Sequence, residues 1–504
     1  MMKINVYSEK SGNFGADSTM KPMIIIESKK KKLETLKEEY PDAMIIDVTS
    51  HAVDEFVPCL GHRKGVHGEE LLGYIEARKQ IEVLFETRKD ISDYNTSYPL
   101  HPSDWSSWKT SDRLSFDGIS DLSFYIHIPF CQSLCRYCEY IKYKKTSESI
   151  ERQYLDIVDG DMRAFAEQSA TGETILRGFD IGGGTPTVLG TENFAKLVEM
   201  SAEYARRFKR AEHFKGSIEA TFNTIDENKI AIISGHSDIF SRISFGLQST
   251  SCVFLRDNNR DNGQTQRMAD IFHSCRQQGI NTINLDLMYG FVHQTKEEIE
   301  ATMKVVERLM PEHLTVYELR TNMLSRYPIA TAEQRFEQYS YLYDLITALG
   351  YQGRFGMNTF SLTGDYGLSS YLQHRMMENG SYKGFGIAAQ SKNGTGISYN
   401  IGKNGESLEC CLSKDTFEEG GDSYILPPRE LLSKYVAISG YCGMIDMSVM
   451  EKILNSDPNM VFEKELGFLL NNHYIEKDGT MLYLTPKGFL HYGAVLSLFY
   501  NNRS

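Results

Sequence analysis

The sequence has no excess of positive charge and no long apolar run. Lys and Arg number 54 against 67 Asp and Glu, which gives a formal net charge of −13 at pH 7. An acidic chain is a poor partner for nucleic acid or an anionic membrane surface. No apolar stretch approaches the length of a membrane span, and the opening "MMKINVYSEKSGNFG" has no apolar core of a signal peptide. We therefore expect a cytoplasmic protein without a membrane span and without a nucleic-acid partner.

Cysteines are few, and most stand alone. Six of the nine are scattered, at positions 59, 252, 275, 410, 411 and 442, and in a reducing compartment such thiols are free and mostly buried. Only Cys131, Cys135 and Cys138 are clustered, with the spacing C-x3-C-x2-C. No second cysteine pair or His pair completes a four-ligand zinc site. A four-iron cluster normally takes four thiolates, so three cysteines leave one iron open to a small chelating molecule. Three buried or zinc-binding thiols are the alternative.

Familiar nucleotide-binding motifs are also absent. The run "GGGTPT" begins at Gly182 and includes Gly183, Gly184 and Thr185, but it contains neither the G-x-G-x-x-G fingerprint nor the lysine of a P-loop. Such a run exposes backbone donors and lets a ligand approach the chain closely. A tight turn without a ligand is the alternative.

Strand and helix patterns alternate along residues 119–350. Apolar strand patterns occupy residues 122–129, 176–183, 214–222, 241–249, 281–290 and 313–320, with helical patterns such as 149–168, 191–208 and 296–310 between them. Repeated strand–helix units imply a parallel sheet covered by helices. Six units predict an α/β fold with a partial (β/α)6, TIM-like barrel, whose functional groups gather at the carboxyl ends of the strands.

The sequence outside residues 119–350 indicates four further regions. Residues 1–100 form an N-terminal α/β domain of unassigned role, in which the Lys29–Lys32 run is best interpreted as a solvated helix face. Residues 101–118 read as a linker. Residues 351–430, rich in Gly, Tyr and Asn, predict a connecting or substrate-covering region. Residues 431–504 predict three helices and a hairpin turning at Asp478–Gly479, a winged-helix-like domain whose lack of basic excess favours a packing or substrate role.

Polar residues recur where the predicted barrel strands end. Glu219, Gln248 and Asp286 each lie in or at the end of a strand pattern, and Arg260 follows twelve residues after Gln248. Because these ends meet at one rim, the four side chains form a mixed set suited to a ligand with amino, carboxylate and ribose groups. Each residue taken alone is equally compatible with a structural role.

Several motifs together resemble one family. "YIHIPFC" with its cysteines, "GGGTPT", "IEA", "RISFGLQS", "NLDLMYG" and "LTPKGF" resemble the oxygen-independent coproporphyrinogen III oxidase-like family of the radical S-adenosylmethionine superfamily, from about residue 120 to the C-terminus. The resemblance implies a radical S-adenosylmethionine barrel in which Cys131, Cys135 and Cys138 ligate a [4Fe–4S] cluster. The open iron holds S-adenosylmethionine, and an electron from the cluster cleaves it to a 5′-deoxyadenosyl radical.

The resemblance also implies roles for the residues at the rim. Tyr125, Gly183 and Glu219 match positions that contact the cluster-bound S-adenosylmethionine. Members of the family also bind a second S-adenosylmethionine nearby, so this chain is expected to bind one or two molecules. The positions that match the second site are Tyr137, Gly184, Thr185, Gln248, Arg260 and Asp286.

The implied activity is that of an oxidoreductase or a class C-type methyltransferase acting on a tetrapyrrole or similar conjugated ring, supplied by an electron donor such as flavodoxin or ferredoxin. The alternative is a heme-binding or heme-delivery protein that keeps the cluster. Three positions depart from the family pattern: Tyr140 stands where the decarboxylase has a further Cys, His293 where a Gly is common, and Phe222 where other members carry Pro.

Other polar or aromatic residues near these motifs are expected to be structural. His127, in "HIPFC", is assigned a packing and orienting role, and Arg242 a pairing role in the barrel wall. Tyr289, Tyr317 and Tyr382 are expected to be core residues.

Overall fold

The computed structural model describes residues 3–6, 23–27, 44–47, 80–89, 98–99, 102–169, 173–319 and 330–501. At the N-terminus, β1 (Lys3–Val6), β2 (Met23–Glu27) and β3 (Met44–Asp47) form a parallel three-stranded sheet. Residues 80–88 are helical. The Lys29–Lys32 run, which was interpreted as a solvated helix face, lies outside the described residues.

Six parallel strands form the centre of the molecule, at the positions that the sequence predicts. They are β5 (Asp121–Ile128), β8 (Ile175–Gly183), β10 (Gly216–Ala220), β11 (Phe240–Gln248), β12 (Thr282–Tyr289) and β13 (His313–Glu318). They pair in this order, each parallel to the next. β13 pairs with the antiparallel β14 (Thr359–Ser361) at one edge, while β5 pairs with the parallel β15 (Ser381–Phe385) at the other. The curved sheet is therefore open, which confirms the expected α/β fold with a partial barrel.

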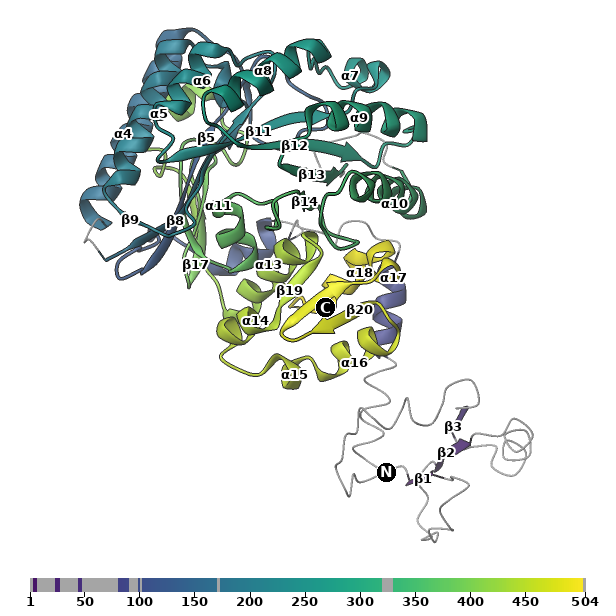
Figure 1. The fold of residues 1–504 in the computed structure, drawn as a ribbon. Coiled ribbons are helices and arrows are strands. Elements are labelled where there is room, and N and C mark those ends of the chain that lie inside the picture. Colours follow the sequence, from purple (N-terminus) through teal and green to yellow (C-terminus); the bar gives the residue numbers. More distant parts are fainter. Residues whose placement is uncertain are drawn as a thin grey trace.

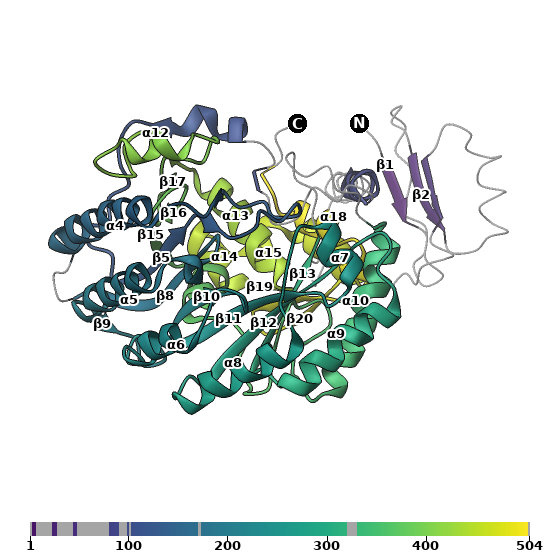
Figure 2. The same ribbon diagram turned by 90° about the horizontal axis from the view of Figure 1, so that it is seen from above.

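Helices cover the convex side of this sheet. Figure 2 shows them as an outer arc around the strands: α4 (Glu148–Ser169), α5 (Thr191–Arg206), α6 (Glu227–Ser234), α8 (Thr265–Gln277), α9 (Lys296–Leu309) and α10 (Ala332–Ala348). The sequence of α9 explains its limits, because Thr295 and Glu298 form a capping box and Met310 ends the helix in a left-handed conformation. Its buried face, with Ile299, Met303 and Val306, has the spacing of an amphipathic helix packed on a sheet.

The sheet continues beyond β15 with short antiparallel strands. β16 (Gln390–Lys392), β17 (Gly396–Tyr399), β18 (Asp422–Ile425) and β4 (Lys109–Thr110) follow one another. Thus residues 351–430 contribute five strands, and the segment 101–118 contributes β4 and η3 (Pro102–Trp108). Within η3, Trp105 is only 2% exposed, so this segment is packed against the sheet extension.

Residues 428–497 form a separate layer beside the barrel (Figure 1). Its elements are α13 (Pro428–Tyr441), β19 (Met444–Asp446), α14 (Met447–Leu454), α15 (Pro458–Val461), α16 (Glu463–Asn471), β20 (Ile475–Asp478), β21 (Met481–Leu484), α17 (Pro486–Leu490) and α18 (Tyr492–Ser497). The expected hairpin is confirmed, since β20 pairs with β21 and Gly479 adopts a φ of 59° in the turn. Ile81 and Phe85 are buried in the core of this layer.

Short elements complete the described chain: β6 (Phe130–Cys131), β7 (Tyr143–Lys144), η4 (Pro186–Val188), β9 (Lys209–Arg210), α7 (Cys252–Asp257), α11 (Ser370–Leu372), η5 (Gln373–Met377) and α12 (Leu408–Leu412). None of the helices in the described part of the chain combines the length and the hydropathy that crossing a membrane requires.

Candidate cluster and cofactor site

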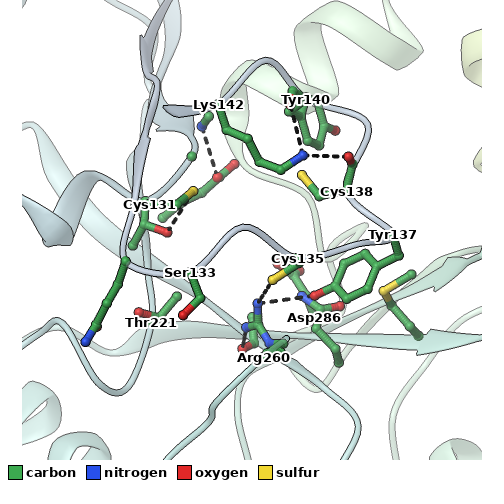
Figure 3. A pocket seen from close by; sticks show the side chains of 18 of the residues that line it. Cys131, Ser133, Cys135, Tyr137, Cys138, Tyr140, Lys142, Thr221, Arg260 and Asp286 are labelled. Carbon is green, nitrogen blue, oxygen red and sulfur yellow. Dashed lines mark hydrogen bonds between the residues drawn. The ribbon is translucent and has the colours of Figure 1, made fainter. Parts of the chain in front are cut away.

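A cavity of about 370 Å³ opens where the barrel strands end. All of the predicted site residues except Tyr125 line it: Cys131, Cys135, Tyr137, Cys138, Gly183, Gly184, Thr185, Glu219, Gln248, Arg260 and Asp286. Figure 3 shows Arg260 and Asp286 beside the cysteine loop, with Arg260 in contact with Cys135 and Tyr137. Tyr125 instead stacks on Tyr371, with ring centroids 5.5 Å apart. The fold thus brings together residues that are separated by more than 150 positions in the sequence.

The three cysteines lie on a loop that is closed at its base. It leaves the barrel through β6 and returns through β7, and these strands are joined by backbone hydrogen bonds from Tyr143 N to Pro129 O at 2.7 Å and from Lys145 N to Cys131 O at 2.8 Å. Cys131 is buried at the base, while Cys135 and Cys138 are half-buried further along. A closed base fixes the loop, so its thiols are held over the cavity.

Donors surround the thiols. Thr185 Oγ1 lies 3.9 Å from Cys131 Sγ, and Arg260 Nη1 lies 3.9 Å from Cys135 Sγ. Lys142 Nζ donates to the carbonyl oxygen of Cys138 at 2.7 Å. Burial raises the pKa of Cys131 to about 11 and also raises the pKa of Cys138. Because thiolates are the metal-binding form, these cysteines depend on a bound cation and on such donors to become ligands.

Gly183 and Gly184 leave space beside the cysteine loop that a side chain at either position would fill. A Cβ on Gly184 would lie 2.9 Å from Cys131 Sγ and 2.6 Å from the carbonyl oxygen of Phe130. Gly183 has a φ of +114°, and a Cβ there would lie 2.7 Å from His127 Nδ1. The run therefore keeps the space beside the first thiol open, as close approach of a ligand to the backbone requires.

The donor set fits a cluster better than a single ion. In the described part of the chain, no three His, Cys, Asp or Glu side chains converge as ligands of one metal ion. Three thiolates on one loop beside an open cavity suit a four-iron cluster with one iron left for another ligand.

Two carboxyl groups line the cavity. Glu219 accepts a hydrogen bond from Gly183 N at 3.2 Å, and Asp286 accepts one from Asn284 Nδ2 at 2.7 Å. Burial, then the nearby Asp286 and Asp180, raise the pKa of Glu219 to about 8. Burial raises the pKa of Asp286 to about 6. The Glu219 side chain is open to the cavity although protein surrounds it, so a bound cation would draw it into its charged form.

Arg260 provides the positive charge opposite these acids. Its Nη1 donates to Tyr137 Oη at 3.2 Å and its Nε to Asn262 Oδ1 at 2.9 Å. No carboxylate among the described residues forms an ion pair with it. Tyr137 in turn stacks on Phe254, with ring centroids 5.8 Å apart. The guanidinium is thus fixed by neutral partners and can bind an anionic group.

Gly246 is a site residue that the sequence analysis missed. β11 has a register irregularity between Gly246 and Gln248, and Gln248 adopts a positive φ of 65°. A Cβ on Gly246 would lie 2.7 Å from Gln248 Nε2 and 2.8 Å from Arg260 Nη2. This glycine lets the two side chains converge. A glycine inside an apolar strand pattern was the available signal.

Other expectations near the site have mixed outcomes. His127 is buried with Nε2 2.9 Å from the carbonyl oxygen of Ile141, and Arg242 is buried and donates to Ser217 Oγ at 2.9 Å, which confirms their structural roles. Tyr289 and Tyr382 are buried, as predicted. Tyr317 was expected in the core but lines the cavity. Residue spacing alone gives no signal for that position, because the cavity edge depends on how β13 ends.

The comparison with known families agrees with this geometry. Residues 125–306 match the model of the radical SAM superfamily. This part of the chain is therefore a radical SAM domain, and such a domain implies a [4Fe–4S] cluster and S-adenosylmethionine in general.

Two kinds of relative are similar to the chain. Heme chaperone HemW of Bacillus subtilis is 29% identical over 292 residues, which cover 56% of this chain and 73% of that protein. Oxygen-independent coproporphyrinogen III oxidase of Salmonella typhimurium is 31% identical over 199 residues, which cover 39% of this chain and 41% of that protein. Among solved structures, coproporphyrinogen III oxidase (HemN) from Escherichia coli has a TM-score of 0.62 at 22% identity, over 76% of this chain and 91% of that one. The last likeness establishes the fold alone.

Proposed function

We propose that this protein is a radical S-adenosylmethionine enzyme acting on a tetrapyrrole or a similar conjugated ring. One observation carries the proposal: three thiols on one closed loop line a single cavity together with Glu219, Asp286 and Arg260. A cavity of this size is in the range of small-molecule sites, about 300–1,000 Å³. Its mixture of thiols, acids and a guanidinium matches the groups of a cluster-bound sulfonium amino acid.

The residues have distinct roles in this proposal. Cys131, Cys135 and Cys138 hold the cluster, with Gly184 and Thr185 beside the first thiol. When bound, a [4Fe–4S] cluster supplies the electron that cleaves S-adenosylmethionine to a 5′-deoxyadenosyl radical.

Glu219 is placed to accept the amine of the cofactor. Asp286 and Gln248 are placed for ribose hydroxyl or amino groups, and Arg260 for a carboxylate.

A second function has its own support. Heme chaperone HemW of Lactococcus lactis is 25% identical over 384 residues, which cover 94% of that protein and 73% of this chain. In addition, Tyr140, at the position where the decarboxylase has a further cysteine, lines the cavity and is 65% exposed. The alternative is therefore a heme-binding or heme-delivery protein that keeps the cluster without turning over a ring substrate.

One anaerobic experiment separates the two functions. The protein is reconstituted with iron and sulfide, then incubated with reductant, S-adenosylmethionine and coproporphyrinogen III. Formation of 5′-deoxyadenosine together with a modified ring supports the enzyme, and S-adenosylhomocysteine beside it identifies methyl transfer. Tight heme binding with no ring product supports delivery.

The cysteine assignment has a direct control. Cys135→Ala should lose most cluster iron, whereas Cys252→Ala, an exposed cysteine in α7, should keep it. A Cys135→Ala protein with the iron and sulfide content of the wild type would contradict the proposed ligand set.

A further inference from the structure

A second cavity lies outside the cluster site. It has a volume of about 190 Å³, is formed between η3, the sheet extension and α13, and shares no lining residue with the first cavity. Its walls include Tyr98, Trp105, Tyr399 and Tyr424. Neighbouring rings meet edge-on or tilted, with centroids 5.8 Å apart for Trp105 and Tyr424 and 6.5 Å apart for Tyr399 and Tyr424. These walls suit a flat apolar ring.

Two lysines also line this cavity. Lys403 Nζ lies 3.1 Å from the centre of the Tyr399 ring, and Lys434 Nζ donates to the carbonyl oxygen of Tyr98 at 2.7 Å. Burial lowers the pKa of Lys403 to about 8, and burial together with repulsion by Arg375 and Lys403 lowers the pKa of Lys434 to about 7. Because both side chains line the same cavity, a bound anion would stabilise the charged form of each.

The acids nearest to these lysines are engaged elsewhere. Asp422 forms an ion pair with Lys109, with Nζ and Oδ1 2.5 Å apart. Glu430 accepts hydrogen bonds from Tyr98 Oη at 2.7 Å, Trp105 Nε1 at 3.0 Å and Asn501 Nδ2 at 2.8 Å. Among the described residues, no carboxylate lies within 4.0 Å of either lysine ammonium. Both lysines therefore line the cavity without a direct ion pair to a described carboxylate, while the charge of Asp422 acts on Lys403 from further away.

We propose that this cavity is a binding site for a small planar aromatic carboxylate. The ring lies between Trp105 and the tyrosines, and the carboxylate bridges Lys403 and Lys434. The volume is below the range of about 300–1,000 Å³ typical of drug-sized ligands, so it suits one ring with one acidic group. Because η3, β17 and α13 all line the site, an occupant joins the sheet extension to the C-terminal layer.

The location of tryptophan makes the test direct. The chain has only two tryptophans, and both Trp105 and Trp108 lie in η3. Intrinsic tryptophan emission of the full-length protein therefore reports on this cavity and not on the cluster site. Benzoate is the probe, with benzyl alcohol as its neutral counterpart and acetate as an anion without a ring.

Benzoate should change the emission saturably, and calorimetry should give one site per chain. Lys403→Met and Lys434→Met should each weaken benzoate binding by about ten-fold or more, the loss expected for one charge-assisted contact. Lys414→Met is the matched control, since this lysine pairs with Glu419 on the surface at 2.6 Å, and it should bind benzoate like the wild type.

Three results would overturn the proposal. They are no saturable binding by the wild type up to roughly 10 mM benzoate, equal binding of acetate or benzyl alcohol, and unchanged benzoate affinity in both cavity variants. Unchanged melting temperatures of the variants confirm that lost binding reflects the missing ammonium. Cleavage of S-adenosylmethionine is a separate readout, so failure here leaves the proposed function standing.

Discussion

The guanidinium of Arg260 lies against the thiol of Cys135, with Nη1 3.9 Å from Sγ. The same nitrogen donates to Tyr137 Oη at 3.2 Å (Figure 3). The two residues are 125 positions apart in the sequence, so this contact ties the cysteine loop to the segment that follows β11. It gives the Cys135 thiol a cationic neighbour and holds the guanidinium at the edge of the cavity.

Replacing this arginine should impair cofactor cleavage without removing the cluster. Arg260→Lys keeps the charge but loses the planar fork that reaches two partners at once. A hydrogen bond to a charged group is worth about 1.5–3 kcal/mol, so we expect a loss of about ten-fold or more in 5′-deoxyadenosine formation.

Iron content and single-turnover product should be measured together. Arg256→Lys is the matched control, because this arginine is 74% exposed in the neighbouring helix α7. Equal rates for Arg260→Lys and the wild type would contradict a role for this side chain at the cofactor.

Adding one methyl group at Gly184 should disturb the cluster. The new Cβ of Gly184→Ala would lie 2.9 Å from Cys131 Sγ and 2.6 Å from a backbone oxygen, so the thiol must move. We expect reduced iron retention and a changed visible spectrum.

Gly160→Ala is the corresponding control in helix α4, where a Cβ meets no atom within 4 Å. That substitution should stabilise the protein by about 0.5–1 kcal/mol and leave the spectrum unchanged. A visible spectrum of Gly184→Ala identical to that of the wild type would refute the proposal that Gly184 keeps the space beside Cys131 open for the cluster.

The raised pKa of Glu219 should appear as a pH-dependent stability of the cluster-free protein. Its folded pKa of about 8 lies above the usual 4.5, so the folded state keeps a proton that the unfolded state releases. The contribution of Glu219 therefore makes the protein less stable as the pH rises from about 4.5 to 8. Glu219→Gln removes this loss of stability with rising pH. The difference in melting temperature between the variant and the wild type should therefore grow in favour of the variant from pH 5 to pH 8.

Asp180 and Asp286 have raised pKa values as well and repel Glu219, so Glu219→Gln also removes this repulsion, and the gain in stability belongs to the three interacting carboxyl groups. Glu192→Gln, at an exposed position of α5, should follow the wild type at every pH. If the melting temperature of Glu219→Gln also follows that of the wild type at every pH, Glu219 does not have the raised pKa inferred here.

The buried ion pair between Glu318, at the end of β13, and Arg335 should stabilise the folded protein. Arg335 Nε lies 2.7 Å from Glu318 Oε1, and the two side chains are 11% and 5% exposed. Tyr492 Oη donates to the other oxygen of Glu318 at 3.0 Å, which links the barrel to the C-terminal layer. Arg335→Met leaves a buried carboxylate without its partner and should reduce the free energy of unfolding by about 3 kcal/mol.

Chemical denaturation measures this loss. Arg163→Met is the control, because Arg163 pairs with Asp159 along α4 and is 59% exposed; it should cost less than about 1 kcal/mol. Similar losses for both variants would mean that the Glu318–Arg335 pair has no special weight.

The sequence by itself determined the order of strands and helices and the presence of a three-thiol loop. These features are local: strand and helix periodicity is repeated over many residues, and the cysteines fall within eight positions. The six barrel strands could therefore be placed, whereas the strands of residues 351–430 could not. β14, β16 and β17 have only three or four residues each, too few for a periodic signal.

Only the tertiary structure decided which of these residues meet. It placed Arg260 beside Cys135 and brought Tyr317 to the cavity edge. Tyr125, which was expected at the site, stacks on Tyr371 and does not line the cavity. It also joined Trp105, Lys403 and Lys434, from three distant segments, around the second cavity. Such contacts depend on how whole elements pack and on where each strand ends, and no spacing in the chain encodes either.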